Sequence, residues 1–160
     1  MRYEFGKVIV ELAAQDPEIH LIVGDIGYQV FDEFRQKFPE RFHNVGVCEQ
    51  AMIGLAAGMA LAGLKPWVYT ITTFLIERPF EQVKIDINQQ RANVKLVGYA
   101  DYPELGPTHA LADENMVDKL KNIRTFYPKD SAETRQAAID AHQHVGPTFI
   151  SLKKDNTRVK

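Results

Sequence analysis

Cysteine is nearly absent from this sequence, which limits how the chain can be stabilised. The single residue, Cys48, excludes an internal disulfide framework and suits a reducing cytoplasm, which is the predicted location. No histidine stands beside Cys48 in the sequence, so we expect a buried, unreactive thiol rather than a nucleophile.

Long hydrophobic runs and a strong net charge are also missing. The uncharged stretch 51–64 is too short and too rich in glycine to span a bilayer. The N-terminal residues MRYEFGK lack the apolar core of a signal peptide. A formal net charge of −2 supplies no field for capturing nucleic acid or an anionic membrane surface. We therefore predict neither a nucleic-acid partner nor a membrane partner.

What is present is an ordinary balance of apolar and charged residues in a regular alternation of elements. At 160 residues, with 45% hydrophobic and 25% charged residues, one domain over 1–160 is expected. Apolar spacing and turn residues predict helices over 3–15, 30–37, 51–64, 74–90, 113–121 and 131–144. Within 74–90, Pro79 must lie in the first turn or kink the helix. Asp113 and Ser131 are the predicted N-caps of the last two helices.

Short runs of β-branched and aromatic residues lie between these helices. They predict strands over 19–23, 41–45, 66–71, 94–99, 123–127 and 148–152. Strands that alternate with helices favour the α/β class, with a parallel sheet covered on both faces.

The segment 44–63 (NVGVCEQAMIGLAAGMALAG) joins one carboxylate to a run of small and apolar residues. Glu49 is its only acid, and Gly54, Ala57 and Gly58 leave a helix face almost without side chains, which another backbone can approach closely. A helix that is apolar all round is expected to be buried in a domain core or in an interface. From the pattern alone, Glu49 either pairs with a group that offsets its burial or only stabilises the helix dipole.

Four blocks of the sequence resemble, in order, the pyrimidine-binding domain of thiamine diphosphate enzymes of the transketolase and deoxyxylulose-phosphate synthase branch. They are the Gly46-Val47-x-Glu49 lead-in with its small-residue helix, KPWVYTITTFLIERPFEQ from Lys65, GPTHALADEN from Gly106, and the terminal GPTFISL from Gly146. The resemblance covers nearly the whole chain and implies a three-layer α/β/α fold with a mainly parallel sheet. It reaches one domain of an enzyme that normally has three, so the diphosphate-binding and C-terminal domains are expected to be absent.

The resemblance implies thiamine diphosphate as the cofactor. Glu49 would donate a hydrogen bond to a ring nitrogen of the aminopyrimidine, and an aromatic side chain would stack on that ring. Phe74 fits the stacking position best and Phe80 second. The loop with Gly24 and Asp25 lacks the Gly-Asp-Gly-to-Asn motif with which these enzymes hold magnesium and diphosphate. Magnesium is therefore expected on a partner subunit, and no metal ligand is predicted in this chain.

Substrate contacts are expected on loops that follow the strands, because these loops meet at one edge of a parallel sheet. His109, in a turn stiffened by Pro107, matches the family's substrate-facing histidine and is the second catalytic candidate, since histidine exchanges protons near neutral pH. Asp25 is a further candidate by the same resemblance. Arg78 either forms a structural ion pair or contacts substrate. Lys154 takes the place of a transketolase arginine that contacts substrate phosphate, which a lysine can bind as a point charge.

Three functions remain open at this point. The first is transfer of a two-carbon ketol unit between sugars or sugar phosphates by the pyrimidine-binding subunit of a split transketolase. The second is a synthase-type condensation of pyruvate with an aldehyde. The third is a non-catalytic interaction subunit, against which the intact Glu49 and His109 argue. We favour the first, which predicts a separate diphosphate-binding subunit, most simply in a two-plus-two heterotetramer with two-fold symmetry.

Overall fold

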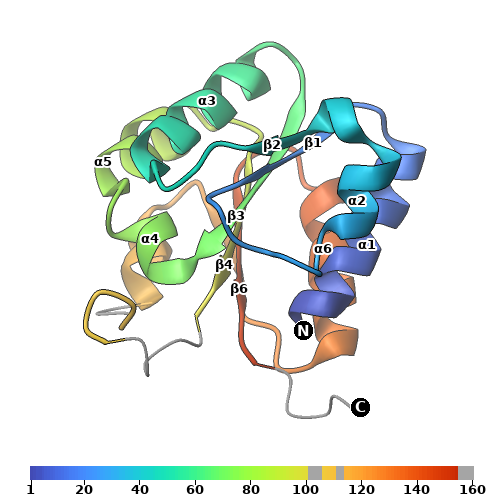
Figure 1. The fold of residues 1–160 in the computed structure, drawn as a ribbon. Coiled ribbons are helices and arrows are strands. Elements are labelled where there is room, and N and C mark those ends of the chain that lie inside the picture. The colour runs from blue at the N-terminus through green and yellow to red at the C-terminus, as the bar shows by residue number, and fades with distance from the viewer. Residues whose placement is uncertain (101–105, 111–113, 155–160) are drawn as a thin grey trace.

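The computed structural model describes residues 1–100, 106–110 and 114–154. Within these residues, six strands form one parallel sheet in the order β2-β1-β3-β4-β6-β5 (Figure 1). The strands are β1 (Ile19–Val23), β2 (Phe42–Asn44), β3 (Lys65–Ile71), β4 (Lys95–Tyr99), β5 (Arg124–Phe126) and β6 (Thr148–Leu152). The central strands β3, β4 and β6 are buried almost throughout, as is typical of parallel strands covered on both faces.

Helices cover both faces of the sheet, and the predicted three-layer α/β/α class is confirmed. On one face lie α1 (Arg2–Gln15), α2 (Asp32–Lys37) and α6 (Ser131–Gln143); on the other lie α3 (Glu49–Leu61), α4 (Thr72–Ile76), α5 (Phe80–Gln82) and the π-helical turn η2 (Val83–Gln89) (Figure 1). The described residues also form two 3-10 turns, η1 (Pro39–Arg41) and η4 (Glu114–Lys119). Across the described residues, no helix combines the length and apolar character needed to cross a membrane.

Each face of the sheet has its own apolar core. Under α1 and α2, the ring of Phe5 packs against Phe31, Trp67 and Tyr69, with centroids 5.9, 5.8 and 6.0 Å apart. On the opposite face, Met52 and Ile53 of α3 and Ile87 of η2 are fully buried in a second core over β1, β3, β4 and β6, to which β6 contributes Phe149. Burial of this apolar surface on both faces is the main force that holds the strands in register.

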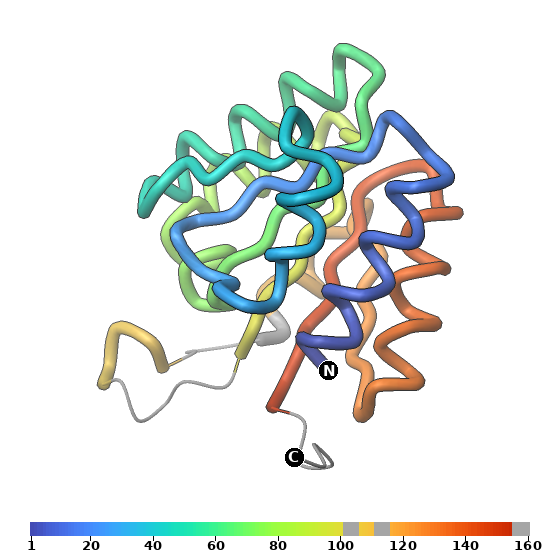
Figure 2. Tube along the Cα trace, turned by 45° about the vertical axis from the view of Figure 1, so that its right-hand side comes forward, coloured from blue at the N-terminus to red at the C-terminus, as the bar shows by residue number. Residues whose placement is uncertain are grey.

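The first and last of the described α-helices, α1 and α6, pack together on the first of these faces. Figure 2 shows α1, in blue, alongside α6, in orange. Arg135 of α6 donates hydrogen bonds to Glu4 at 3.0 Å and to Glu11 at 2.6 and 2.7 Å, both on α1. Helices α1 and α6 are therefore held together in one layer.

The segment predicted as a helix over 74–90 is helical on both sides of Pro79, but it is broken there rather than kinked. The chain forms α4, then a turn over 77–79, then α5 and η2. Pro79 causes the break, because its ring removes a helical hydrogen-bond donor and its backbone, at φ −99° and ψ 28°, lies outside the α-helical region. Phe74, predicted as the first residue of that helix, lies in α4, a helix that starts directly at the end of β3.

Two predicted N-caps have different outcomes. Asp130, and not Ser131, caps α6: its carboxylate accepts a hydrogen bond from the backbone N–H of Glu133 at 2.8 Å. The residue at N3 completes the cap, since the Glu133 side chain accepts from the backbone N–H of Lys129 at 2.9 Å. Asp113 lies outside the described residues, and the helix predicted to follow it is the 3-10 turn η4.

Candidate functional site

The turn before α3 places a carboxylate in the interior of the domain. Gly46 has a positive φ of 73°, which glycine adopts at little cost, and it turns the chain from β2 into the helix. Glu49 is the first residue of α3, where the positive end of the helix dipole favours a carboxylate. Its side chain is only 2% exposed. A charge so deeply buried requires a partner.

The partner of Glu49 is Arg78, in the turn between α4 and α5. The Nη1 atom of Arg78 donates to both carboxylate oxygens of Glu49, each at 3.2 Å. The guanidinium also lies over the ring of Phe74, 3.5 Å from its centroid. One planar cation thus contacts a buried carboxylate through its hydrogen bonds and an aromatic ring through its face, an arrangement favoured by cation–π attraction.

His109 lies on the same aromatic ring. The imidazole of His109 and the ring of Phe74 have centroids 4.9 Å apart at an interplanar angle of 60°. The loop around His109 is held to α4, because the hydroxyl of Thr73 donates to the His109 carbonyl at 3.1 Å. The backbone N–H of His109 donates to the carbonyl of Gly106 at 3.0 Å, which closes the turn. Glu49, Arg78, Phe74 and His109 therefore form one continuous set of contacts.

A glycine in β4 allows this set to form. A Cβ atom at Gly98 would lie 2.4 Å from the hydroxyl oxygen of Thr72 and 3.0 Å from its Cα. Only a residue without a side chain lets α4 begin in direct contact with β4. Because α4 is close to the sheet, Phe74 and Thr73 reach the loop that follows β4.

Asp25 belongs to a neighbouring polar cluster that a second residue organises. Asn44, at the end of β2, accepts hydrogen bonds from the backbone N–H groups of Asp25 at 3.0 Å and Gly46 at 3.1 Å. It also donates to the Asp25 carboxylate at 3.2 Å, and the Tyr28 hydroxyl donates to the same oxygen at 3.1 Å. Asn44 therefore connects the loop after β1 to the turn that leads to Glu49.

Sequence reasoning missed both Asn44 and Thr73. Asn44 stands between a strand and a glycine turn, a position where an amide side chain often bonds to nearby backbone groups. That local signal was present in the sequence. The bond from Thr73 to the His109 loop joins residues 36 apart, and no local pattern indicates it.

The remaining predicted residues lie apart from these contacts. Phe80 is partly buried and packs against the apolar core on the α3 face, so Phe74 is the ring that contacts the Glu49–Arg78 pair. Lys154 is exposed, two residues beyond the end of β6. The prediction of a buried Cys48 is wrong: the residue is exposed as the N-cap of α3, and its thiol donates to the Val45 carbonyl at 2.8 Å.

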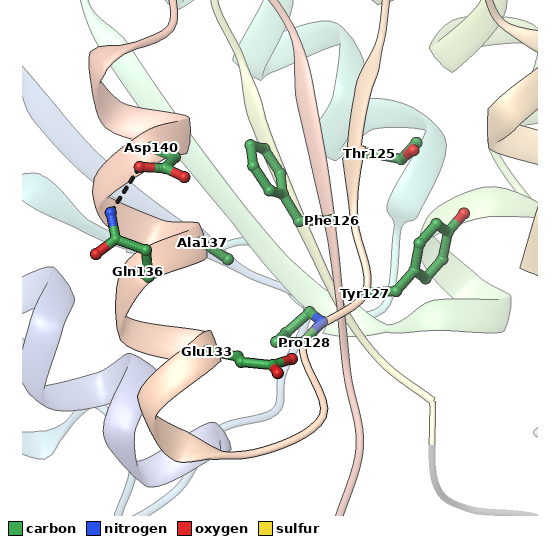
Figure 3. Close-up of a pocket in the computed structure, with 8 residues that line it drawn as sticks. All are labelled: Thr125, Phe126, Tyr127, Pro128, Glu133, Gln136, Ala137 and Asp140. Atoms are coloured by element: carbon green, nitrogen blue, oxygen red, sulfur yellow. Dashed lines mark hydrogen bonds between the residues drawn. The ribbon is translucent and has the colours of Figure 1, made fainter.

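A hollow of about 350 Å³ lies elsewhere, between β5 and α6 (Figure 3). Its two carboxylates already have partners within the chain, since Asp140 accepts from Gln136 at 2.7 Å and Glu133 completes the cap of α6. None of the predicted site residues lines this hollow, whose lining residues are Thr125, Phe126, Tyr127, Pro128, Glu133, Gln136, Ala137 and Asp140. We assign the function to the edge that carries Glu49 instead.

The edge with Glu49 has the chemistry to bind a planar, hydrogen-bonding ring. Phe74 offers an aromatic face and Glu49 offers a buried hydrogen-bonding group, and both are in contact with the same planar group, the guanidinium of Arg78. His109 adds a proton donor or acceptor next to that ring.

Comparisons with known proteins identify the family of this chain. The family model described as "Transketolase, pyrimidine binding domain" matches residues 1–160. The chain is 40% identical over 123 residues to an apulose-4-phosphate transketolase subunit of Actinobacillus succinogenes, a match that covers 74% of this chain and 40% of that protein. It is 37% identical over 152 residues to "1-deoxy-D-xylulose-5-phosphate synthase" of Leptothrix cholodnii, which covers 91% of this chain and 23% of that one.

A solved structure described as "Split gene transketolase, inactive beta4 tetramer" has the same fold. It superposes with a TM-score of 0.88 at 31% sequence identity, over 99% of this chain and 52% of that chain. This chain therefore spans about half, or less, of the length of these relatives.

Proposed function

Because this chain belongs to the family of transketolase pyrimidine-binding domains, we propose that it is the pyrimidine-binding subunit of a split, thiamine diphosphate-dependent transketolase. In this proposal the complex transfers a two-carbon ketol unit between sugars or sugar phosphates in the cytoplasm. The observation that carries it is the contact of one planar cation with both Glu49 and Phe74, which are the two groups that an aminopyrimidine ring requires.

Each residue of the site has a distinct role in the proposal. Glu49, in its acid form, donates a hydrogen bond to a ring nitrogen of the aminopyrimidine, and Phe74 stacks on the ring and excludes water from it. When bound, thiamine diphosphate supplies the electron sink for carbon–carbon bond cleavage. His109 hydrogen-bonds or protonates the sugar oxygens at the edge of the ring. Asp25 and Lys154 are assigned to substrate contacts, Lys154 to a substrate phosphate.

The proposal assigns magnesium and the diphosphate group to a partner subunit. The described part of the chain holds no group of three His, Cys, Asp or Glu residues that could bind a metal ion. A diphosphate is strongly hydrated, and a metal with several donors is needed to offset its burial. Stacking on Phe74 and one hydrogen bond from Glu49 leave that requirement unmet, so the complete site needs a second chain.

The surface of α3 supports such a partner. One side of this helix is exposed although it carries no charge: Leu55 is 43% exposed and Leu61 is 69% exposed. Nothing lies within 4 Å of a Cβ atom placed at Gly54 or Gly58, so another backbone has room to approach this face. Exposed apolar surface next to an incomplete site favours an interface. We propose a two-plus-two heterotetramer with two-fold symmetry.

A second candidate has its own support. The match to a 1-deoxy-D-xylulose-5-phosphate synthase covers 91% of this chain. Condensation of pyruvate with an aldehyde would use the same contacts at Glu49 and Phe74, since both reactions need the same cofactor ring. The two candidates differ in the donor, which is a ketose in the first and a 2-oxo acid in the second.

Reconstitution of the complex tests the proposal. The chain is purified alone and with the diphosphate-binding subunit, and its mass, its magnesium-dependent affinity for thiamine diphosphate and its turnover on a panel of ketoses, aldehydes and pyruvate are measured. We expect weak, roughly millimolar cofactor binding by the chain alone, and ketol transfer only by the complex. Full activity of the isolated chain would refute the split enzyme, and turnover of pyruvate without ketoses would select the synthase.

A further inference from the structure

The position of Arg78 has a consequence for how the cofactor enters the site. We infer that Arg78 is a placeholder: its guanidinium lies where the aminopyrimidine is proposed to bind, and it must leave before the ring can bind. This inference rests on the proposed function and adds to it a residue that controls access to the cofactor site.

The contacts of Arg78 coincide with those proposed for the ring. Its Nη1 atom donates to both oxygens of Glu49 at 3.2 Å, and its Cζ atom lies over the ring of Phe74, 3.5 Å from the centroid. A ring that stacks on Phe74 needs the face of Phe74 over which the guanidinium lies, so the guanidinium and the aminopyrimidine cannot both occupy this face. The two groups therefore compete for the same two residues.

The charge state of Glu49 reinforces this competition. A carboxylate accepts hydrogen bonds from the guanidinium, whereas the proposed contact with a ring nitrogen requires Glu49 to donate a proton. The proposed contact therefore needs Arg78 to leave and Glu49 to gain a proton from solvent. The cation that stabilises the buried carboxylate thus opposes the form of Glu49 that binds the ring.

The backbone around Arg78 permits this exchange. Arg78 lies in the turn over 77–79, between α4 and α5, so its movement breaks no helical hydrogen bond. Its side chain is 37% exposed, against 2% for Glu49, so the guanidinium has a direct path to solvent. The ring of Phe74 and the carboxyl of Glu49 can stay in place while Arg78 turns outward.

The competition predicts that removing Arg78 strengthens ring binding. When a binding site is open in only a fraction of the molecules, the apparent affinity of its ligand is reduced by that fraction. Removing the competing side chain in Arg78→Ala should therefore raise the affinity for the ring about tenfold. The affinity of Arg78→Lys should lie between those of the unaltered chain and Arg78→Ala, because a lysine attracts the Glu49 carboxylate but has no planar group to stack on Phe74. A residue that instead holds the cofactor would give the opposite sign.

Thiamine without its diphosphate is the probe, and the isolated full chain is titrated with it by NMR. The affinity is compared for the unaltered chain, Arg78→Ala and Arg78→Lys. Arg124→Ala is the matched control, because Arg124 is also placed over a phenylalanine ring, that of Phe126 at 5.0 Å, on strand β5. The Nε–Hε signal of Arg78 reports directly whether its guanidinium leaves the ring of Phe74.

We expect Arg78→Ala to bind thiamine more tightly than the unaltered chain and Arg124→Ala to bind it equally well. In the unaltered chain, the Arg78 signal should shift towards its solvent value during the titration. Weaker or unchanged binding by Arg78→Ala overturns the inference, as does failure of that variant to bind thiamine. Either of these contradicting results would still be compatible with the proposed function, provided that the reconstituted complex transfers ketol units. Absence of such transfer with every donor is the separate result that refutes the proposed function.

Discussion

Among the residues that the structure describes, two charged side chains are almost completely buried, one at each end of the sheet, and their surroundings differ. Lys95, at the amino end of β4, is 1% exposed, and its ammonium donates three hydrogen bonds, to Asn93 at 2.8 Å, the His144 carbonyl at 2.6 Å and the Gly146 carbonyl at 2.8 Å. Glu49, at the carboxyl end, is 2% exposed and is held by one cation at 3.2 Å.

The difference separates a structural charge from a candidate functional one. An ammonium has three donors, and all three of Lys95 have acceptors on rigid backbone or a neighbouring amide, so nothing further can bind there. The carboxylate of Glu49 depends on a partly exposed arginine in a turn, and that partner can be exchanged for a ligand. A buried charge with one replaceable partner is a better candidate for function than a buried charge with a full set of partners.

The largest expected effect at the functional end is that of Glu49→Gln. The substitution keeps the shape of the side chain but removes the proton that the carboxylic acid donates, so turnover of the reconstituted complex should fall by roughly 10²–10⁴-fold. The thermal unfolding temperature serves as the control and should change little. Near-normal turnover would contradict the role of Glu49 and the comparison built on it.

A smaller effect is expected from His109→Ala at the same end. The imidazole lies against Phe74 but has no contact with Glu49 among its described interactions, so it should act on the substrate and not on the cofactor. We expect kcat/KM for the sugar to fall about 10- to 100-fold, the value of one hydrogen bond to a charged group. Cofactor affinity, measured by calorimetry on the complex, should be unchanged. Lost cofactor affinity with normal sugar kinetics would show that this role is wrong.

At the structural end, Lys95→Met should lower stability and leave the chemistry intact. Burial and the nearby Lys65 lower the pKa of Lys95 to about 7, so the charge itself is costly and the three acceptors offset that cost. Methionine relieves the cost but leaves the acceptors unpaired, for a net loss of about 1–2 kcal/mol in the free energy of unfolding. Urea unfolding measures this loss. A fall in cofactor affinity without a fall in stability would overturn the division between the two ends.

The smallest expected effect is a pH dependence that arises at the structural end. Burial lowers the pKa of His142 from 6.5, and the charges of Lys65 and Lys95 lower it further, although Asp16 acts in the opposite direction. The folded chain therefore binds a proton at His142 less readily than the unfolded chain does. Its stability should fall as the pH falls below 6.5, because the unfolded state gains that proton first.

The variant His142→Gln isolates this contribution. Urea unfolding at about pH 7.5 and about pH 5 gives the change in stability for each chain, and the change should be smaller in the variant. His142 does not contact the Glu49 side chain in the described structure, so cofactor affinity at neutral pH should be the same in both chains. An identical pH dependence in the two chains would remove His142 from this account.

Local patterns predicted helices and strands well where apolar residues followed a clear spacing or formed a short run. The apolar face of 3–15 and the buried run of 19–23 correspond to α1 and β1, because helical spacing and β-branched runs are local signals. The region after β3 was predicted less well. Pro79 ended α4 before Arg78, and contact with Gly98 brought the start of α4 against β4. The effect of Pro79 is local, but the break that it causes is larger than the sequence analysis expected. The contact with Gly98 joins residues that are far apart in the chain.

The sequence by itself determined the class of fold, the family, and the placement of Glu49 at the start of an uncharged helix, because these follow from residue order and short-range spacing. Only the tertiary structure decided which groups meet there. Arg78 is 29 residues from Glu49 in the chain, and its guanidinium reaches both Glu49 and Phe74 because parallel pairing and the close packing of α4 on β4 bring three separate loops to one edge. Such contacts depend on the register of whole strands, which no local pattern encodes.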